Sequence, residues 1–112
     1  MKYLMFVCVD EELVNPESVK DMPRDTIAWV EEMDGRGVRV QGNRLAKLPT
    51  ATTVRVREGE VVLADGPFAE TKEYIAGYDI LECGDLDEAI EVAGKHPVAK
   101  IGAIEVRPFA ED

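Results

Sequence analysis

The order of strand-like and helix-like segments limits what this chain can fold into. Two segments with helical spacing of apolar residues, near residues 25–34 and 86–94, each lie between runs that are typical of strands. The expected strands are residues 2–9, 38–41, 52–57, 60–65, 77–83 and 101–107. This order predicts an α+β fold, in which a ferredoxin-like sheet carries two main helices on one face and has an extra β-hairpin.

The helix boundaries follow from capping residues and breakers. The first helix is expected to begin near Asp25 or Thr26, after an irregular stretch that Pro23 ends. The second is expected to begin after Asp85, which forms a capping box with Glu88. The residues expected to face the core are Ile27, Trp29, Val30 and Met33 in the first helix and Leu86, Ala89, Ile90 and Ala93 in the second.

The hairpin is expected to turn at Glu58 and Gly59. A two-residue loop there pairs residues whose numbers sum to 117. This register puts the pairs Val56–Val61, Val54–Leu63 and Thr52–Asp65 on one face, and the pairs Arg57–Glu60, Arg55–Val62 and Thr53–Ala64 on the other. A three-residue loop with a bulge would shift the pairing by one residue and mix the two faces. One face of the whole sheet is expected to be bare and apolar, with side chains from the hairpin and the first strand. A second copy of the chain would cover it.

Length and charge exclude several classes of protein. A chain of 112 residues is one domain, residues 1–112. The 13 basic and 23 acidic residues give a net charge of −10, which disfavours nucleic-acid and anionic-lipid partners. No apolar run is long enough for a membrane span, and the start of the chain resembles a strand rather than a signal peptide. Cys8 and Cys83 lie in strand-like runs, as buried, reduced thiols of a cytoplasmic protein would.

A block at residues 65–73, Asp-Gly-Pro-Phe-Ala-Glu-Thr-Lys-Glu, resembles the DGPF branch of the YCII-related proteins. The resemblance extends over nearly the whole chain, with further matches at residues 1–5, 51–55, 77–78, 86–89, 95–97 and 105–108. It implies a ferredoxin-like α+β fold, pairing of two chains into a dimeric α+β barrel, and a bacterial origin. Most members of the family have no assigned reaction.

The resemblance also bears on function. Some DGPF members are encoded beside, or fused to, sigma factors of the extracytoplasmic-function type. A few YCII relatives are enzymes that act on small aromatic compounds with a His–Asp pair, whose His lies in the region of the first helix. Residues 13–37 of this chain contain no His, and its one His is His96.

Asp65 and His96 are the candidate catalytic residues. Asp65 ends a strand on the apolar face of the hairpin, where partial burial would raise the pKa of its carboxyl and suit it to acid/base work. The structural alternative is a turn residue that accepts N–H bonds from residues 67 and 68. His96 is either a general base or, since it lies before Pro97 at the end of the second helix, a helix cap.

Five further residues are candidates for binding a substrate. Lys72 would hold an anionic group and Glu70 or Glu73 would move a proton, or these residues belong to a solvated loop whose charges pair with one another. Arg55 is either a substrate clamp or a surface ion pair. Phe68 and Tyr78 either contact a ligand or pack in the core or the dimer seam.

No motif for a metal, nucleotide or other cofactor is present in the sequence, so none is expected. Two functions remain open, and with them whether the protein is an enzyme. The first is a homodimer with a small-molecule pocket near residues 65–78, which performs proton transfer without a cofactor, with Asp65 as the acid/base. The second is a non-catalytic module that binds a sigma-factor-related protein.

Overall fold

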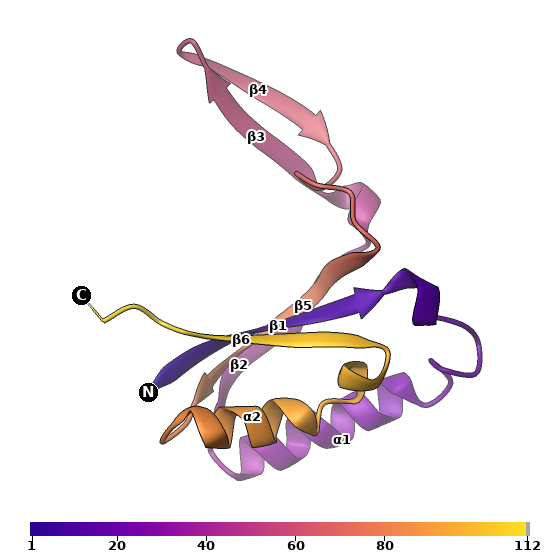
Figure 1. The fold of residues 1–112 in the computed structure, drawn as a ribbon, viewed down its shortest axis with the longest axis vertical. Helices are drawn as coiled ribbons and strands as arrows, with labels where there is room; N and C mark the ends of the chain where they lie inside the picture. The colour runs from indigo at the N-terminus through magenta and orange to yellow at the C-terminus, as the bar shows by residue number, and fades with distance from the viewer. Residues whose placement is uncertain (112) are drawn as a thin grey trace.

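The main sheet has four antiparallel strands, described here from a computed structural model of residues 1–111 (Figure 1). The strands lie in the order β2 (Arg39–Arg44), β5 (Glu73–Glu82), β1 (Lys2–Asp10), β6 (Gly102–Pro108). Helices α1 (Met22–Gly35) and α2 (Leu86–Gly94) lie together on one face of this sheet. Three short 3₁₀ turns link the elements, at Glu11–Leu13, Leu48–Thr50 and Pro97–Lys100. This arrangement confirms the predicted ferredoxin-like α+β architecture.

The hairpin has the predicted bounds and register, in strands β3 (Thr52–Arg57) and β4 (Glu60–Asp65). Glu58 and Gly59 both have positive φ, 52° and 79°, as a two-residue loop that follows the strand twist requires. The hairpin forms a sheet of its own and projects away from the main sheet (Figure 1). The expectation that its valines extend the bare face of the main sheet was therefore wrong.

The core lies between the main sheet and the two helices. Alternate side chains of β1 point into it, because side chains along a strand alternate between its two faces. Trp29 and Met33 of α1, Leu81 of β5 and Val92 of α2 complete the centre. The Trp29 Nε1–H group donates to the Val92 carbonyl oxygen at 2.9 Å, which joins the two helices. Both cysteines are free thiols; Cys83 is buried and Cys8 half-buried.

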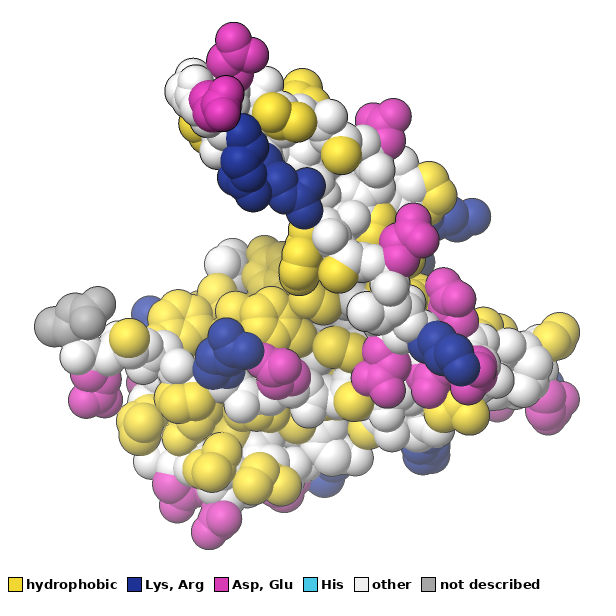
Figure 2. All heavy atoms as spheres, turned by 45° about the horizontal axis from the view of Figure 1, so that its top comes forward, with side chains coloured by type: hydrophobic (Ala, Val, Ile, Leu, Met, Phe, Trp, Pro, Cys, Tyr) yellow, Lys and Arg dark blue, Asp and Glu magenta, His cyan; other side chains and the backbone are white. Residues whose placement is uncertain are grey.

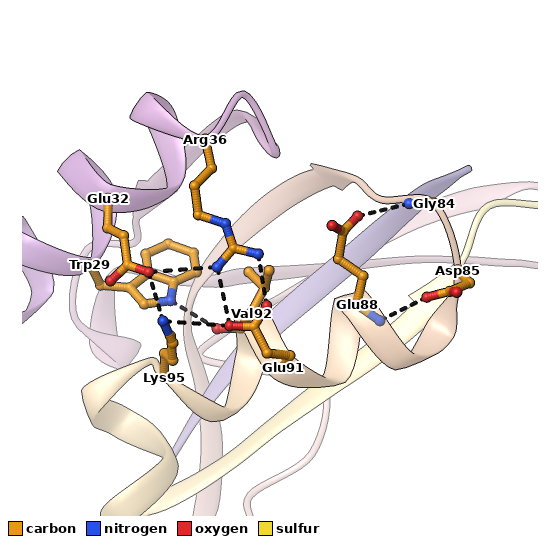
Figure 3. A network of polar contacts seen from close by, with 9 residues as sticks. All are labelled: Trp29, Glu32, Arg36, Gly84, Asp85, Glu88, Glu91, Val92 and Lys95. Atoms are coloured by element: carbon orange, nitrogen blue, oxygen red, sulfur yellow. Dashed lines mark hydrogen bonds and ion pairs between the residues drawn. The ribbon is translucent and has the colours of Figure 1, made fainter.

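Charged side chains also connect the two helices (Figure 3). Arg36 at the end of α1 pairs with Glu91 of α2 at 2.7 Å, and Lys95 pairs with Glu32 at 2.8 Å. The N-terminus of α2 is capped as predicted, since the Asp85 carboxylate accepts from the Glu88 N–H group.

Two expectations for the helices were wrong. Helix α1 begins at Met22, and Pro23 lies in its first turn, where an N–H group has no partner within the helix and its loss does no harm. Ile27, Leu86 and Ile90 are at least half exposed, and Val92 is buried instead. Helix α2 has apolar residues on two sides, and spacing alone does not say which side meets the sheet.

Strand boundaries also differ from the prediction. β5 begins at Glu73, four residues before the predicted start, because Asp10 and Cys8 of β1 pair with Glu73 and Ile75. β2 continues through Gly42 and Asn43, beyond the predicted end at residue 41, and its pairing with β5 has an irregularity between Arg39 and Gln41. Pairing with a long neighbouring strand thus extends the ladder into segments with a weak strand pattern of their own.

The hairpin gives the molecule a flat, extended shape. The molecule measures 48 × 43 × 18 Å along its principal axes, and its radius of gyration is 15.9 Å. A compact domain of this length has a radius of gyration of about 13 Å. Within residues 1–111, no helix has the length and apolar character that crossing a membrane demands.

Candidate functional site

A groove lies at the base of the hairpin, between the segment that enters it and the segment that leaves it. Its walls are residues 45–53 and residues 66–75, and it encloses about 1190 Å³. Leu45, Leu48, Pro49 and Phe68 supply much of its apolar lining. Its charged lining residues are Glu11, Lys47, Glu70, Lys72 and Glu73. An apolar cleft with few polar groups is the usual form of a small-molecule site.

Three of the predicted site residues come together in this groove: Phe68, Glu70 and Lys72. The Phe68 side chain is 80% exposed, so it is not a core residue of the single chain. Lys72 forms an ion pair with Glu12 at 2.5 Å, and both side chains are largely in water. An exposed pair of this kind stabilises the fold little, so an anionic ligand could replace Glu12 at small cost.

Backbone and threonine contacts hold the turn that carries these residues. The Gly66 N–H group donates to the Ala51 carbonyl oxygen at 2.7 Å, and the Thr53 hydroxyl donates to the Gly66 carbonyl oxygen at 2.8 Å. Gly66 has a φ of 94°, which favours glycine. Thr71 Oγ1 donates to the Glu73 carbonyl oxygen. The wall formed by residues 66–75 is thereby fixed at one end to the start of β3 and at the other end to the start of β5.

Asp65 lies next to the groove but does not line it. It is exposed at the end of β4, opposite Thr52 and on the same face of the hairpin as Val54 and Val56. Within residues 1–111, its carboxylate accepts no hydrogen bond from residues 67 and 68, so the turn contact expected for it is not formed.

Arg55 and Tyr78 lie on other surfaces. Arg55 is exposed on the charged face of the hairpin, opposite Val62, and makes no ion pair within the described part of the chain. Tyr78 is half-buried on the face of the main sheet that has no helices, opposite Phe6. Neither residue lines the groove of its own chain.

His96 is enclosed by the core, with 4% of its surface exposed. Its Nδ1 accepts from the Val98 N–H group at 3.1 Å, and its ring meets the Trp29 ring edge-on at 4.8 Å between centroids. Burial lowers the pKa of His96 to about 4, so the imidazole is neutral at pH 7. His96 is a cap, but of the 3₁₀ turn that follows it, rather than a charged cap on the end of α2.

A buried ion pair that the sequence analysis missed lies at the other end of the sheet. Asp79 accepts from Arg39 Nε at 2.8 Å, and Arg39 also reaches Asp34 and the Gly42 carbonyl oxygen. Burial raises the pKa of Asp79, although Arg39 opposes the shift. A Cβ atom on Gly42 would lie 2.0 Å from Asp79 Oδ1, so glycine is required there. The only signal in the sequence is an aspartate inside an apolar strand.

A structural role fits this pair better than a catalytic one, because it faces the helices and lies away from the groove. Residues 1–111 hold no group of three or more His, Cys, Asp or Glu side chains arranged to bind a metal ion.

The sequence profile of the YCII-related domain matches residues 1–111. This chain belongs to the YCII-related family. It is 38% identical to an uncharacterised protein of Rhizobium meliloti (strain 1021), over 86% of each chain. Among solved structures, it is similar to the 5-chloro-2-hydroxyhydroquinone dehydrochlorinase TftG from Burkholderia phenoliruptrix AC1100, in complex with 2,5-dihydroxybenzoquinone. That likeness has a TM-score of 0.57 and covers 100% of this chain and 96% of the other, at 15% identity. It confirms the fold of this YCII-related chain.

Proposed function

We propose that this YCII-related protein is a homodimer that binds a small organic molecule in the groove at the base of the hairpin. The observation that carries the proposal is the meeting of Phe68, Glu70 and Lys72 in a groove whose exposed lining is mostly apolar. The Phe68 ring in the same groove as the Lys72 ammonium suits a small aromatic or carbonyl compound with a negative charge, and Lys47 brings a second cation to the groove. That the structurally similar TftG was solved with a dihydroxybenzoquinone supports this class of ligand.

The chemistry we propose is proton transfer without a cofactor: an isomerisation, an elimination or a hydrolysis. Lys72 would stabilise negative charge that develops on a phenolate or enolate oxygen. Glu70 or Asp65 would accept the proton from substrate carbon or from water and return it later. His96 has no part in this proposal, because the core encloses it away from the groove.

A thermal-shift screen against small acids, phenols, quinones and lactones tests the proposal. A ligand at about 100 times its Kd adds about 2.7 kcal/mol to the free energy of unfolding, which raises the Tm by several degrees. We expect coherent hits among anionic aromatic compounds. Lys72→Met should weaken their binding about tenfold or more and leave neutral analogues less affected.

Lys100→Met is the matched control, because Lys100 is an exposed lysine outside the groove. It should bind every hit as the wild type does. Hits that bind Lys72→Met and the wild type equally would remove Lys72 from the site. A screen without hits would favour the second function below.

The second candidate is a non-catalytic interaction module for a sigma-factor-related protein. The exposed apolar hairpin and the net charge of −10 favour it, because together they suit a partner with a basic rim around an apolar patch. Co-purification with the product of a neighbouring sigma-factor gene, lost on removal of the hairpin valines, is its expected result.

A further inference from the structure

One face of the hairpin is apolar and almost wholly in water. Val54, Val56, Val61 and Leu63 share this face in the β3–β4 register, and their side chains are 58–66% exposed. We call these four residues the hairpin apolar face. β3 and β4 contact chiefly each other, so the other residues that the structure describes do not cover the hairpin apolar face. A contiguous exposed apolar patch on a two-stranded sheet marks an interaction surface.

A second apolar surface lies on the main sheet, on the side without helices. Leu4 and Phe6 of β1 and Tyr78 and Ile80 of β5 point to this side and are half-buried. We call these four residues the open sheet face. Hydrophobic side chains gather on the body below the hairpin (Figure 2), and the hairpin projects over them without covering them. Within residues 1–111, neither surface therefore has a partner.

The accessible surface that this chain exposes beyond that of a compact monomer is large enough for a stable dimer interface. The chain exposes 7818 Å². A folded monomer of this mass exposes about 6,100 Å², so the excess is about 1,700 Å². A standard protein–protein interface buries about 800 Å² on each partner. A second copy of the chain is the simplest occupant, because it brings one hairpin apolar face and one open sheet face, and a twofold axis satisfies both at once.

The groove continues from this surface. Thr52 lines the groove and pairs with Asp65, and both residues lie on the same face of the hairpin as Val54 and Leu63. A body that packs on the hairpin apolar face therefore also borders the groove and Asp65.

We propose that the hairpin is an exchanged arm. Its apolar face packs on the open sheet face of a second copy, and the partner's sheet closes the groove, so that each small-molecule pocket is built from two chains. This inference rests on the homodimer and the pocket of the proposed function. It assigns Asp65, which lies outside the groove of the single chain, to the boundary of the shared pocket.

Two adjacent valines provide a matched test. Val61 belongs to the hairpin apolar face, whereas Val62 points to the opposite face and lies across from Arg55. Val61→Glu should weaken the dimer at least about 100-fold, because two apolar contacts are lost and two carboxylates are buried in each dimer. Val62→Glu introduces the same charge on the same strand and should leave the dimer intact. Size-exclusion chromatography with light scattering measures both.

A photo-crosslinking experiment tests which surface the arm touches without depending on those variants. A photoreactive phenylalanine analogue at position 61 should link to residues 4–6 or 78–80, and the same analogue at position 62 should not. Mixing unlabelled and ¹⁵N-labelled chains should show these links between different chains.

Three outcomes would overturn the exchanged arm. They are a monomeric wild type, a Val61→Glu variant that dimerises as tightly as Val62→Glu, and crosslinks formed only within one chain. The ligand screen is read separately. Ligand hits on a wild type whose arm fails these tests would leave the small-molecule site standing, and a confirmed arm with no hits would leave the dimer without the site.

Discussion

At the scale of single residues, His96 links the stability of the protein to pH. Burial holds its pKa at about 4, below the 6.5 of an exposed histidine, so the unfolded chain binds a proton more readily than the folded one. The contribution to stability is complete above pH 6.5 and is lost as the pH falls toward 4. It amounts to about 3 kcal/mol of unfolding free energy, measurable by urea denaturation at a series of pH values.

His96→Asn is the comparison variant, because the asparagine side-chain oxygen can accept from the Val98 N–H group in place of Nδ1. We expect the wild type to lose about 3 kcal/mol more than His96→Asn between about pH 7 and pH 4. Parallel curves for the two proteins would mean that His96 titrates normally in the folded state.

The sequence could show which residues carry chemistry but not which of them the fold encloses. Phe68, Glu70 and Lys72 lie close together in the chain, so their meeting in one groove could be predicted. The burial of His96 depends on Trp29, which lies far away in sequence. The Arg39–Asp79 pair likewise needs β2 and β5 to be neighbours, which the residues alone do not reveal.

At the scale of elements, the orientation of α2 makes a testable distinction between neighbouring apolar residues. Val92 is fully buried against the sheet and α1, whereas Ile90 is 55% exposed. Val92→Ala should lower the free energy of unfolding by about 2 kcal/mol, because it leaves a cavity. Ile90→Ala should cost less than about 1 kcal/mol, although it removes more atoms.

Urea unfolding of the two variants decides the matter. Equal losses, or a larger loss for Ile90→Ala, would mean that α2 is rotated about its own axis relative to the orientation described here.

Element order and hairpin register could be predicted because each follows from a local pattern. The Glu58–Gly59 loop and the alternation of valine and arginine along β3 fix the pairing of β3 with β4. The separation of the hairpin from the main sheet could not be predicted. The same face of β3 and β4 is apolar whether the hairpin joins the main sheet or stands apart from it, so the sequence pattern does not distinguish the two arrangements.

At the scale of the whole molecule, a dimer held by the arms should unfold in a concentration-dependent way. Folding and association are then linked, so a tenfold rise in protein concentration stabilises the dimer by about 1.4 kcal/mol. For two chains of this length, that should raise the Tm by about 3 °C. Scanning calorimetry at about 10 µM and about 100 µM measures it.

Val61→Glu should show a Tm that does not change with concentration over the same range, because its chains unfold as monomers. A wild-type Tm that is equally constant would contradict the coupling between the arms and the fold.

The position of the single tryptophan determines which part of this protein can be followed by fluorescence. Trp29 is the only tryptophan in the chain and belongs to α1, which lies far from the hairpin (Figure 1). The fluorescence of Trp29 therefore follows the unfolding of the two helices and does not report on the hairpin arm. Far-ultraviolet circular dichroism, which senses every strand, would register loosening of the arm first. A gap between the two melting curves would thus measure how independently the arm and the body come apart.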